Sequence, residues 1–292
     1  MNWKKDVGGW LLASPYVLAA TVFFLIPLGW SLSLVFYDWN LIDPVRQFVG
    51  LENFRTAFTT SRVLYAFVNT YKYAAIFVPS VVVAALVLAL IVQHLPRLKQ
   101  FFAVGFFLPY LASGVAVGLV VRGILSYDSP FNEFLRATFG SSPRWLRDPT
   151  LALVVISAMI VWKFAGYYAL IFLAGLQGIP RELYEAACLD GAGPFVQFRR
   201  ITLPLLYPAF YTVLVLAVGL CFGIFTEPYV LTGGGPRFAT HTWQLEIYYQ
   251  AFDRYRAGYG ATVAVLNAVA TFVSVLIIRR VVEAWGVRRG FR

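Results

Sequence analysis

The chain alternates between long apolar runs and shorter polar segments. Apolar runs lie at 10–36, 66–92, 101–121, 151–176, 205–226 and 258–278. Each is about as long as a helix needs to be to cross roughly 30 Å of hydrocarbon. The pattern therefore predicts an all-α, polytopic membrane protein with about six transmembrane helices.

The first apolar run follows Lys4 and Lys5, as the hydrophobic part of a secretory signal peptide would. It is longer than the usual ~7–15-residue signal core, and further apolar runs follow it. We therefore expect a retained first helix. Pro15 and Pro27 inside it predict kinks, since neighbouring helices can satisfy the carbonyl groups that proline frees.

Composition agrees with a membrane environment. Of the 292 residues, 60% are hydrophobic and 13% are charged, whereas about a quarter of residues are charged in soluble domains. The mean hydropathy is +0.70. No repeat or low-complexity linker divides the chain, so a single membrane domain over 1–292 is the simplest organisation. Its surroundings are then lipid, and its net charge of +10 is no argument for a nucleic-acid partner.

The basic residues predict the orientation of the spans. Together, the two ends of the chain (1–9 and 279–292) and the segments 93–100 and 177–203 hold twelve lysine and arginine residues. The other three loops, 37–65, 122–150 and 227–257, are longer together but hold only ten arginines and no lysine. By the positive-inside rule, both termini and the segment 177–203 lie in the cytoplasm. The residues on that side are Lys4, Lys5, Arg97, Lys99, Arg181, Arg199, Arg200, Arg279, Arg280, Arg288, Arg289 and Arg292.

The polar segment 179–204 has the signals of a short exposed helix. Pro180 suits the first helical position, Glu182 places negative charge near the helix N-terminus, and Gly191 ends the turn. One face of this helix is small and mostly apolar, because its members recur at spacings of three and four. They are Leu183, Ala186, Ala187 and Asp190.

No catalytic centre is indicated. The glycine cluster Gly233-Gly234-Gly235 lacks the lysine of a phosphate-binding loop, and it lies in a predicted external loop. His94 and His241 fall on opposite sides of the membrane, so no metal site is expected. Cys188 and Cys221 lie in a polar segment and an apolar span, which argues against a disulfide framework.

Lys163 is the candidate for a residue of the substrate path. It lies near the middle of the fourth span, where an ionisable side chain normally faces a partner or a wet cavity. Trp162, Tyr167 and Tyr168 could complete an aromatic-walled site for a sugar. Alternatively, Lys163 pairs with a neighbouring helix, and the aromatic cluster reflects composition alone. Glu227, after the fifth span, is either a helix-end charge or a gate residue.

The segment 179–204 closely resembles the EAA loop of the transmembrane subunits of binding-protein-dependent ABC importers. Glu185-Ala186-Ala187, three residues, Gly191, nine residues and Ile201-Thr202-Leu203-Pro204 match every position of that pattern. Other short sequence segments resemble those of the carbohydrate-uptake branch, which includes maltose and glycerol-3-phosphate permeases. They are 176–180, 190–192, 231–236 with Thr240, 50–54 and Asn69-Thr70.

The resemblance implies a type I ABC importer permease-like (MetI-like) fold and a permease subunit that is not itself an enzyme. Its implied partners are a second permease, two ATP-binding subunits and an extracytoplasmic solute-binding protein. The resemblance suggests that the two permeases form a heterodimer, and a homodimer stays open at the sequence level. The chain would bind no cofactor, because ATP and Mg are held by the ATPase. The implied coupling residues are Glu185, Ala186, Ala187, Asp190 and Gly191.

Alternatives to this assignment stay open at the sequence level. Within the importer class, the solute could be an amino acid, a peptide or an ion in place of a sugar, an oligosaccharide or a glycerol phosphate. From another class, the chain could be an autonomous channel or a membrane-embedded enzyme, and activity of the lone chain in liposomes would favour those.

Overall fold

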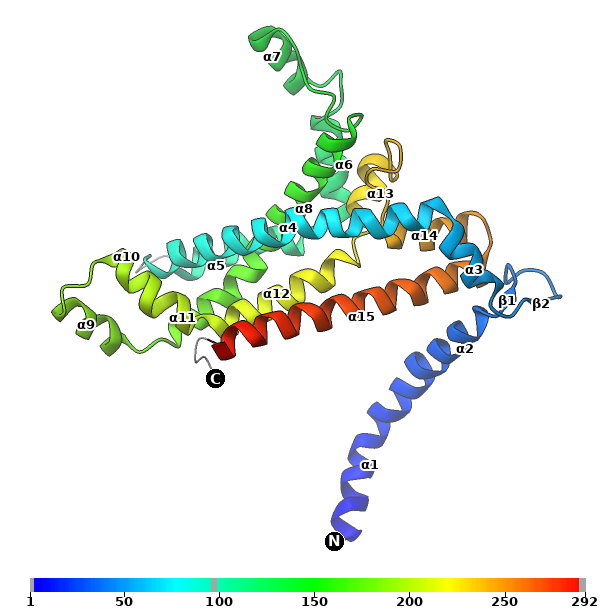
Figure 1. Cartoon of the computed structure of the whole chain (residues 1–292), viewed down its shortest axis with the longest axis horizontal. Helices are drawn as coiled ribbons and strands as arrows, with labels where there is room; N and C mark the ends of the chain where they lie inside the picture. The colour runs from blue at the N-terminus through cyan, green and yellow to red at the C-terminus, as the bar shows by residue number, and fades with distance from the viewer. Residues whose placement is uncertain (1–2, 96–98, 289–292) are drawn as a thin grey trace. The chain divides into compact units, whose positions relative to one another are not determined.

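The computed structural model of the chain describes residues 3–95 and 99–288 (Figure 1). It contains two compact units: residues 1–63 with 246–266, and residues 64–245 with 267–292. Compactness does not test independent folding, so the single-domain organisation stays a prediction. Of the basic residues used to predict orientation, Arg97, Arg289 and Arg292 lie outside the described residues.

The first unit begins with one long helical span over residues 9–34. It consists of α1 (Trp3–Ala20), the π-helical turn η1 (Thr21–Leu25) and α2 (Ile26–Leu34). The N–H of Ile26 bonds the carbonyl of Thr21, five residues back, immediately before Pro27. A π-helical turn is a common site of helix bending. It therefore accommodates Pro27 without ending the span, while Pro15 lies within α1.

A short element of two strands and one helix follows this span. Strands β1 (Tyr37–Asp38) and β2 (Gln47–Phe48) pair antiparallel, and α3 (Glu52–Thr59) comes next. The buried side-chain amide of Asn53 donates hydrogen bonds to the carbonyls of Val35 (2.9 Å) and Tyr37 (3.0 Å). Asn53 thus fixes α3 to the end of the first span. The unit also contains the end of α14 (Trp243–Tyr248), the π-helical turn η3 (Tyr249–Asp253) and the start of α15 (Ala257–Arg288).

The second unit is built around α8 (Pro149–Gln177), whose buried residues lie along its whole length. Asp148 caps the start of α8 by accepting hydrogen bonds from the N–H groups of Thr150 and Leu151. On one side α8 packs on α5 (Lys99–Leu111), and on another it packs on α12 (Tyr207–Cys221). Gly166 permits the first contact, because a side chain there would overlap the carbonyl of Phe106. Val154, Ala158 and Trp162, four residues apart along one side of α8, are exposed, so α8 is buried on the rest of its surface and open along that stripe.

The predicted span 101–121 is two helices rather than one. Residues 101–111 of α5 and α6 (Gly114–Ile124) meet at an angle of 86°. Ser113, between them, caps the start of α6 by accepting from the N–H of Ala116. The break has a local cause, since Pro109 supplies no N–H for the last turn of α5 and Ser113 favours a new helix start.

The predicted span 205–226 is also shorter than expected. α12 ends at Cys221, and a separate helix, α13 (Thr226–Thr232), follows and packs on α6 and α8. The remaining elements of this unit are α4 (Ser61–Gln93), which begins at its boundary, α7 (Pro130–Phe139), α9 (Arg181–Leu189), α10 (Pro194–Gln197), the π-helical turn η2 (Phe198–Thr202) and α11 (Leu203–Leu205).

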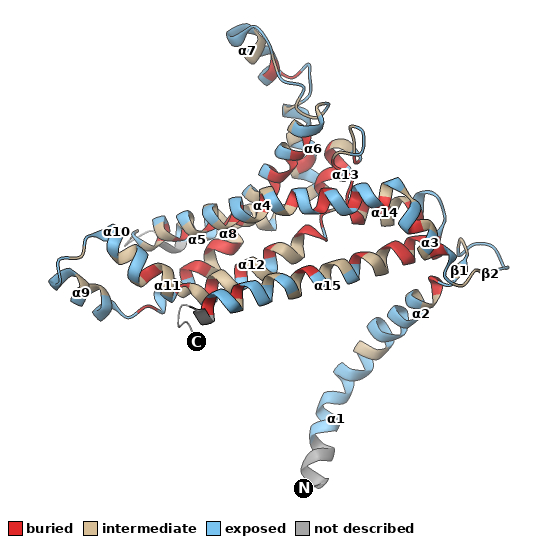
Figure 2. Cartoon of the chain, in the orientation of Figure 1, coloured by how far each residue is buried: buried red, intermediate tan, exposed pale blue. Residues whose placement is uncertain are grey.

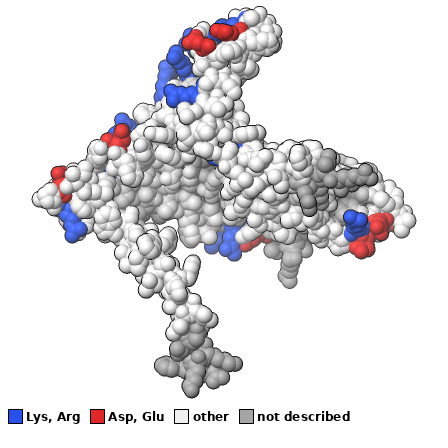
Figure 3. Space-filling view, turned by 180° about the vertical axis from the view of Figure 1, so that it is seen from behind, with Lys and Arg blue, Asp and Glu red and all other residues white. Residues whose placement is uncertain are grey.

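Within the described residues, four helices are long and apolar enough to cross a membrane, and two bent pairs raise the number to six. Figure 2 shows buried residues along α8 and α13, while α4 and α15 carry many exposed positions. On the face shown in Figure 3, wide areas without charge separate a few clusters of charged side chains. Such apolar outer surfaces are what a helix bundle presents to lipid.

Candidate functional site

The segment 179–204, here called the coupling segment, folds into two short helical arms. Its first arm, α9, begins at Arg181 with Glu182 in the first turn, one residue later than the sequence predicts. The N–H of Gly191 bonds the carbonyl of Cys188 at 3.0 Å, and the N–H of Ala192 bonds that of Ala187 at 2.8 Å. This pair of bonds is a Schellman motif, with Gly191 in the left-handed conformation at φ +75°.

The second arm runs back from that turn and is fixed to the first. The Tyr184 hydroxyl on α9 lies 2.9 Å from the Thr202 hydroxyl on η2. The Gln197 amide donates to the carbonyl of Ala192 at 2.9 Å. These contacts at both ends of the turn hold the arms together, so the coupling segment has a defined shape of its own.

The coupling segment exposes an apolar surface outside the spans. Every residue of α9 is exposed or half-buried, including Glu185, Ala186, Ala187 and Asp190 beside it. Leu189 is 91% exposed and Phe195 is 74% exposed. Exposed apolar residues clustered on a segment that also carries acidic side chains are typical of a protein-binding surface. The small residues Ala186 and Ala187 allow close approach of a partner.

A second candidate site lies where Lys163 of the spanning helix α8 meets Glu227 of the short helix α13. The Lys163 ammonium is 3.2 Å from the Glu227 carboxylate, and the two side chains are 15% and 8% exposed. The start of α6 adjoins the pair, since a side chain at Gly114 would approach the Lys163 ammonium within 2.9 Å. The pair therefore joins α8 to the two helices that follow the breaks, α6 and α13. Its mutual neutralisation allows both charges to be buried.

The four residues predicted to line the substrate path do not all lie together in the structure. Tyr167 stacks on Tyr110 with ring centroids 4.8 Å apart, and Tyr168 is buried beside Tyr167 at 5.1 Å. Trp162 is 52% exposed and lines an apolar cavity of ≈ 740 Å³ between α4, α5 and α8. Lys163 and Trp162 are neighbours in the sequence, so the helix turns them to different faces. A substrate-path role for these residues stays a prediction.

Sequence reasoning left open the partner of Lys163, which the structure identifies as Glu227. The signal for this pair was the presence of two opposite charges in or beside apolar spans. No sequence signal identified Gly114, whose proximity depends on the bend between α5 and α6. Among the described residues, no group of three or more His, Cys, Asp or Glu side chains is placed to hold a metal ion.

Two of the sequence segments that indicate the carbohydrate-uptake branch, Asn69-Thr70 and 231–236, are linked through residues 238–241 of the loop after α13. The buried amide of Asn69 on α4 donates to the carbonyls of Phe238 (2.6 Å) and His241 (3.0 Å). Thr240 in the same loop bonds the Thr232 hydroxyl and the carbonyl of Gly235, each at 2.7 Å. Asn69 and the loop after α13 therefore form one polar cluster, although they are far apart in the sequence.

Residues 54–285 match the family model described as "Binding-protein-dependent transport system inner membrane component". The match covers most of the chain and includes the coupling segment, the ion pair and the Asn69 cluster. The chain belongs to this family. It is therefore an inner membrane component of a transport system and crosses the membrane several times.

Curated relatives cover nearly the whole chain. The sn-glycerol-3-phosphate transport system permease protein UgpA of Escherichia coli (strain UTI89 / UPEC) is 34% identical, with 94% of each chain covered. The probable ABC transporter permease protein YesP of Bacillus subtilis is 31% identical, with 97% of this chain and 92% of YesP covered. YurN, another probable ABC transporter permease protein of Bacillus subtilis, is 31% identical, with 88% of this chain and 90% of YurN covered.

Solved structures confirm the predicted importer-permease fold. A chain of a bacterial ABC transporter involved in the import of the acidic polysaccharide alginate matches with a TM-score of 0.82 at 23% identity, covering 97% of this chain and 98% of that one. A chain of the alginate transporter in complex with its alginate pentasaccharide-bound periplasmic protein matches with a TM-score of 0.83 at 22% identity. That second match covers 100% of this chain and 98% of the other.

Proposed function

We propose that this family member is the permease subunit of an ATP-driven importer for a sugar, an oligosaccharide or a glycerol phosphate. The observation that carries the proposal is the complete EAA pattern on the exposed coupling segment, in a chain of the matching family. The solute class rests on the relatives, one of which is a glycerol-3-phosphate permease, and on the fold shared with an alginate transporter.

ATP hydrolysis belongs, in this proposal, to two separate subunits that also hold ATP and Mg. The first arm of the coupling segment fits a helix-in-groove contact, because Leu183 and the small Ala186 are exposed on one face and acidic Glu185 is exposed beside that face. Glu185 would meet a basic side chain of the ATPase. Gly191 and the bonds around it would hold the arm at a fixed angle to the membrane spans.

A second permease would complete the translocation path. The apolar window of the first span, within residues 9–34, has no buried residue in the described structure. That span therefore needs lipid or another membrane protein around its whole circumference. A heterodimer of two similar permeases is the proposed arrangement, with a solute-binding protein on the outer side and both termini in the cytoplasm.

The pair Lys163–Glu227 and the ring pair Tyr110–Tyr167 are the proposed polar lining of the path. Aromatic rings offer stacking surfaces for a sugar, and the partly exposed ammonium offers hydrogen-bond donors for its hydroxyls. Because the ammonium is already neutralised by Glu227, the lining carries little net charge in this conformation.

Purification of the tagged chain from its native membranes in mild detergent, followed by mass spectrometry, tests the proposal. We expect an ATPase and a second six-helix protein to remain bound, and ATP hydrolysis to increase when the matching solute-binding protein is added with its solute. A chain that transports solute in liposomes without any ATPase would contradict the proposal and favour an autonomous channel.

A further inference from the structure

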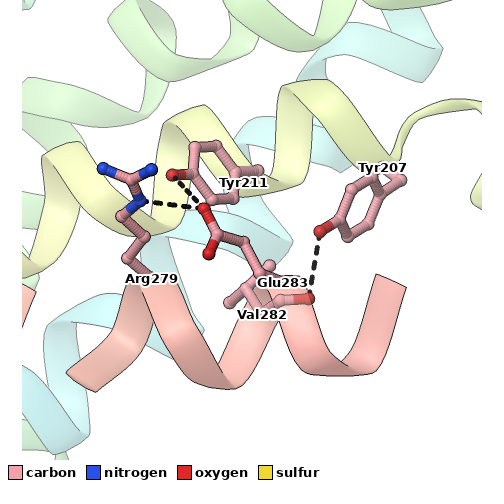
Figure 4. Close-up of polar contacts among 5 residues, drawn as sticks. All are labelled: Tyr207, Tyr211, Arg279, Val282 and Glu283. Carbon is pink, nitrogen blue, oxygen red and sulfur yellow. Dashed lines mark hydrogen bonds and ion pairs between the residues drawn. The ribbon is translucent and has the colours of Figure 1, made fainter. Parts of the chain in front are cut away.

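The coupling segment leads into a bend, and the chain just after this bend contacts α15, the last helix. The pieces 194–205 and 207–221 meet at 64°, and the fully buried Leu206 lies at the bend. Tyr207 is the first residue of α12 after that bend. Its hydroxyl donates a hydrogen bond of 3.0 Å to the main-chain carbonyl of Val282 on α15 (Figure 4).

Gly286 permits this contact. A side chain at Gly286 would overlap the Tyr207 ring and hydroxyl, with the ring atom Cε2 only 2.8 Å from the added carbon. The Tyr207 ring also lies beside Trp285, with centroids 6.0 Å apart. The ring therefore sits against the bare backbone of one particular turn of α15. Axial sliding of α12 along α15 would bring it against bulkier side chains.

A second contact lies one turn further along α12, at Glu283, the residue after Val282 on α15. The Tyr211 hydroxyl donates to the Glu283 carboxylate at 3.3 Å, and the same carboxylate oxygen accepts from the Arg279 guanidinium at 2.8 Å (Figure 4). Tyr207 and Tyr211 are four residues apart and so share a face of α12. Together they fix both the axial position and the rotation of α12 relative to α15.

We propose that Tyr207 is a positioning residue that transfers movement of the coupling segment to α15. The inference rests on the proposed function, in which an ATPase moves that segment. The second arm ends at Leu205, the chain bends at the buried Leu206, and the next residue, Tyr207, contacts α15. No flexible linker therefore separates the second arm from its contact with the last helix. A displacement of the arm then shifts α12 and α15 together.

The test measures whether α15 moves together with the second arm of the coupling segment when ATP binds. Spin labels are placed at Arg200→Cys on η2 and Ile277→Cys on α15, both exposed positions, after replacement of Cys188 and Cys221. Distances in the purified complex with its ATPases are recorded by pulsed electron paramagnetic resonance, without nucleotide and with ATP. Tyr207→Phe removes the hydroxyl and keeps the ring, and Gly286→Ala separates the ring from the backbone.

Tyr71→Phe is the matched control, because the Tyr71 hydroxyl also bonds α15, at Ser274 (2.8 Å), but extends from α4. With native Tyr207, we expect the distance between the labels to stay the same when ATP binds. With Tyr207→Phe, we expect the distance between the labels to change in part of the molecules when ATP binds, because loss of one hydrogen bond raises the equilibrium constant for separation of the arm from α15 about fivefold. ATP hydrolysis and thermal stability should stay close to those of the control.

Three results would contradict these claims, and they are distinguishable. If Tyr207→Phe and Tyr71→Phe give the same distances in a complex that hydrolyses ATP, the positioning role is wrong. If the labels already move apart when ATP binds to the complex with native Tyr207, the joint does not transmit movement. If no ATPase binds the chain, the proposed function fails, and this inference fails with it.

Discussion

At the residue scale, the most demanding feature is a pair of opposite charges buried within the spans. Lys163 and Glu227 are 3.2 Å apart and largely shielded from solvent. An isolated charge at that depth costs several kcal/mol, of the order of 3 by insertion scales, so each group depends on the other. The pair also explains why a lysine is tolerated in the middle of the apolar α8.

A charge-neutral double substitution should be better tolerated than a single one. We expect Glu227→Gln to destabilise the complex by about 3–5 kcal/mol, because it leaves Lys163 buried without a counter-charge. Lys163→Met combined with Glu227→Gln should recover most of that loss. Thermal unfolding of the three proteins in one detergent measures the effect. Equal or greater instability of the double variant would show that the charges do not depend on each other.

At this scale, the sequence indicated that Lys163 is unusual but did not identify its partner, Glu227. Lys163 was identifiable because an ionisable side chain in an apolar span needs a counterpart. The counterpart depends on where α13 turns back towards α8, and no sequence spacing specifies that packing. The separation of Trp162 from Tyr167 and Tyr168 was in principle predictable, because residues five or six apart in a helix lie roughly 120–140° apart around its axis.

At the element scale, the geometry of the coupling segment depends on one glycine. Gly191 has φ +75°, a conformation that costs a residue with a side chain about 1–2 kcal/mol. Nothing lies within 4 Å of a side chain placed there, so the cost of substitution is conformational and not steric. The Schellman motif after α9 is consequently sensitive to the backbone at this position alone.

Gly191→Val should therefore weaken coupling while the spans stay folded. The matched control is Gly193→Val, since Gly193 has φ −69° and equally open surroundings. We expect Gly191→Val to reduce the amount of ATPase that co-purifies by roughly 5–30-fold, the factor that corresponds to 1–2 kcal/mol, and Gly193→Val to retain it. Equal ATPase retention by the two variants would contradict the role of the left-handed turn.

The packing of α5 on α8 offers a second test at this scale. Gly166→Ala should prevent the close approach to the Phe106 carbonyl, and overpacking of this kind typically costs about 1–3 kcal/mol or more. Gly105→Ala, on α5 with nothing within 4 Å, is the control. The yield of monodisperse protein in size-exclusion chromatography measures the difference. Unchanged yield of Gly166→Ala would show that α5 and α8 can separate without cost.

The positions of the long spanning helices could be predicted from the sequence, whereas the bends that interrupt two of the predicted spans could not. Apolar runs long enough to span a membrane identified α4, α8 and α15 because hydrocarbon thickness sets helix length. The bends of 86° and 64° fall within or beside apolar sequence that continues without interruption, so hydropathy alone could not reveal them. Pro109 and Ser113 were local signals for the first bend, and the Pro204–Pro208 region was one for the second.

At the scale of the whole molecule, this family member is one part of a transport system. Its coupling segment exposes apolar and acidic side chains outside the spans, and its first span has no buried residue in the apolar window. Both surfaces require other molecules to cover them. The proposed ATPases and second permease would supply those contacts, and the EAA pattern predicts that Glu185 lies against the ATPase.

Crosslinking from Glu185 in the native membrane tests that contact most directly. Glu185→Cys, in a chain whose Cys188 and Cys221 are replaced, is treated with a short bifunctional reagent, and the adducts are identified by mass spectrometry. Asp43→Cys, exposed in the loop between β1 and β2 that the charge distribution predicts to be external, is the control. We predict an adduct with an ATP-binding subunit from position 185 and none from position 43. Absence of an ATPase adduct at position 185, from a chain that still transports its solute, would contradict the account.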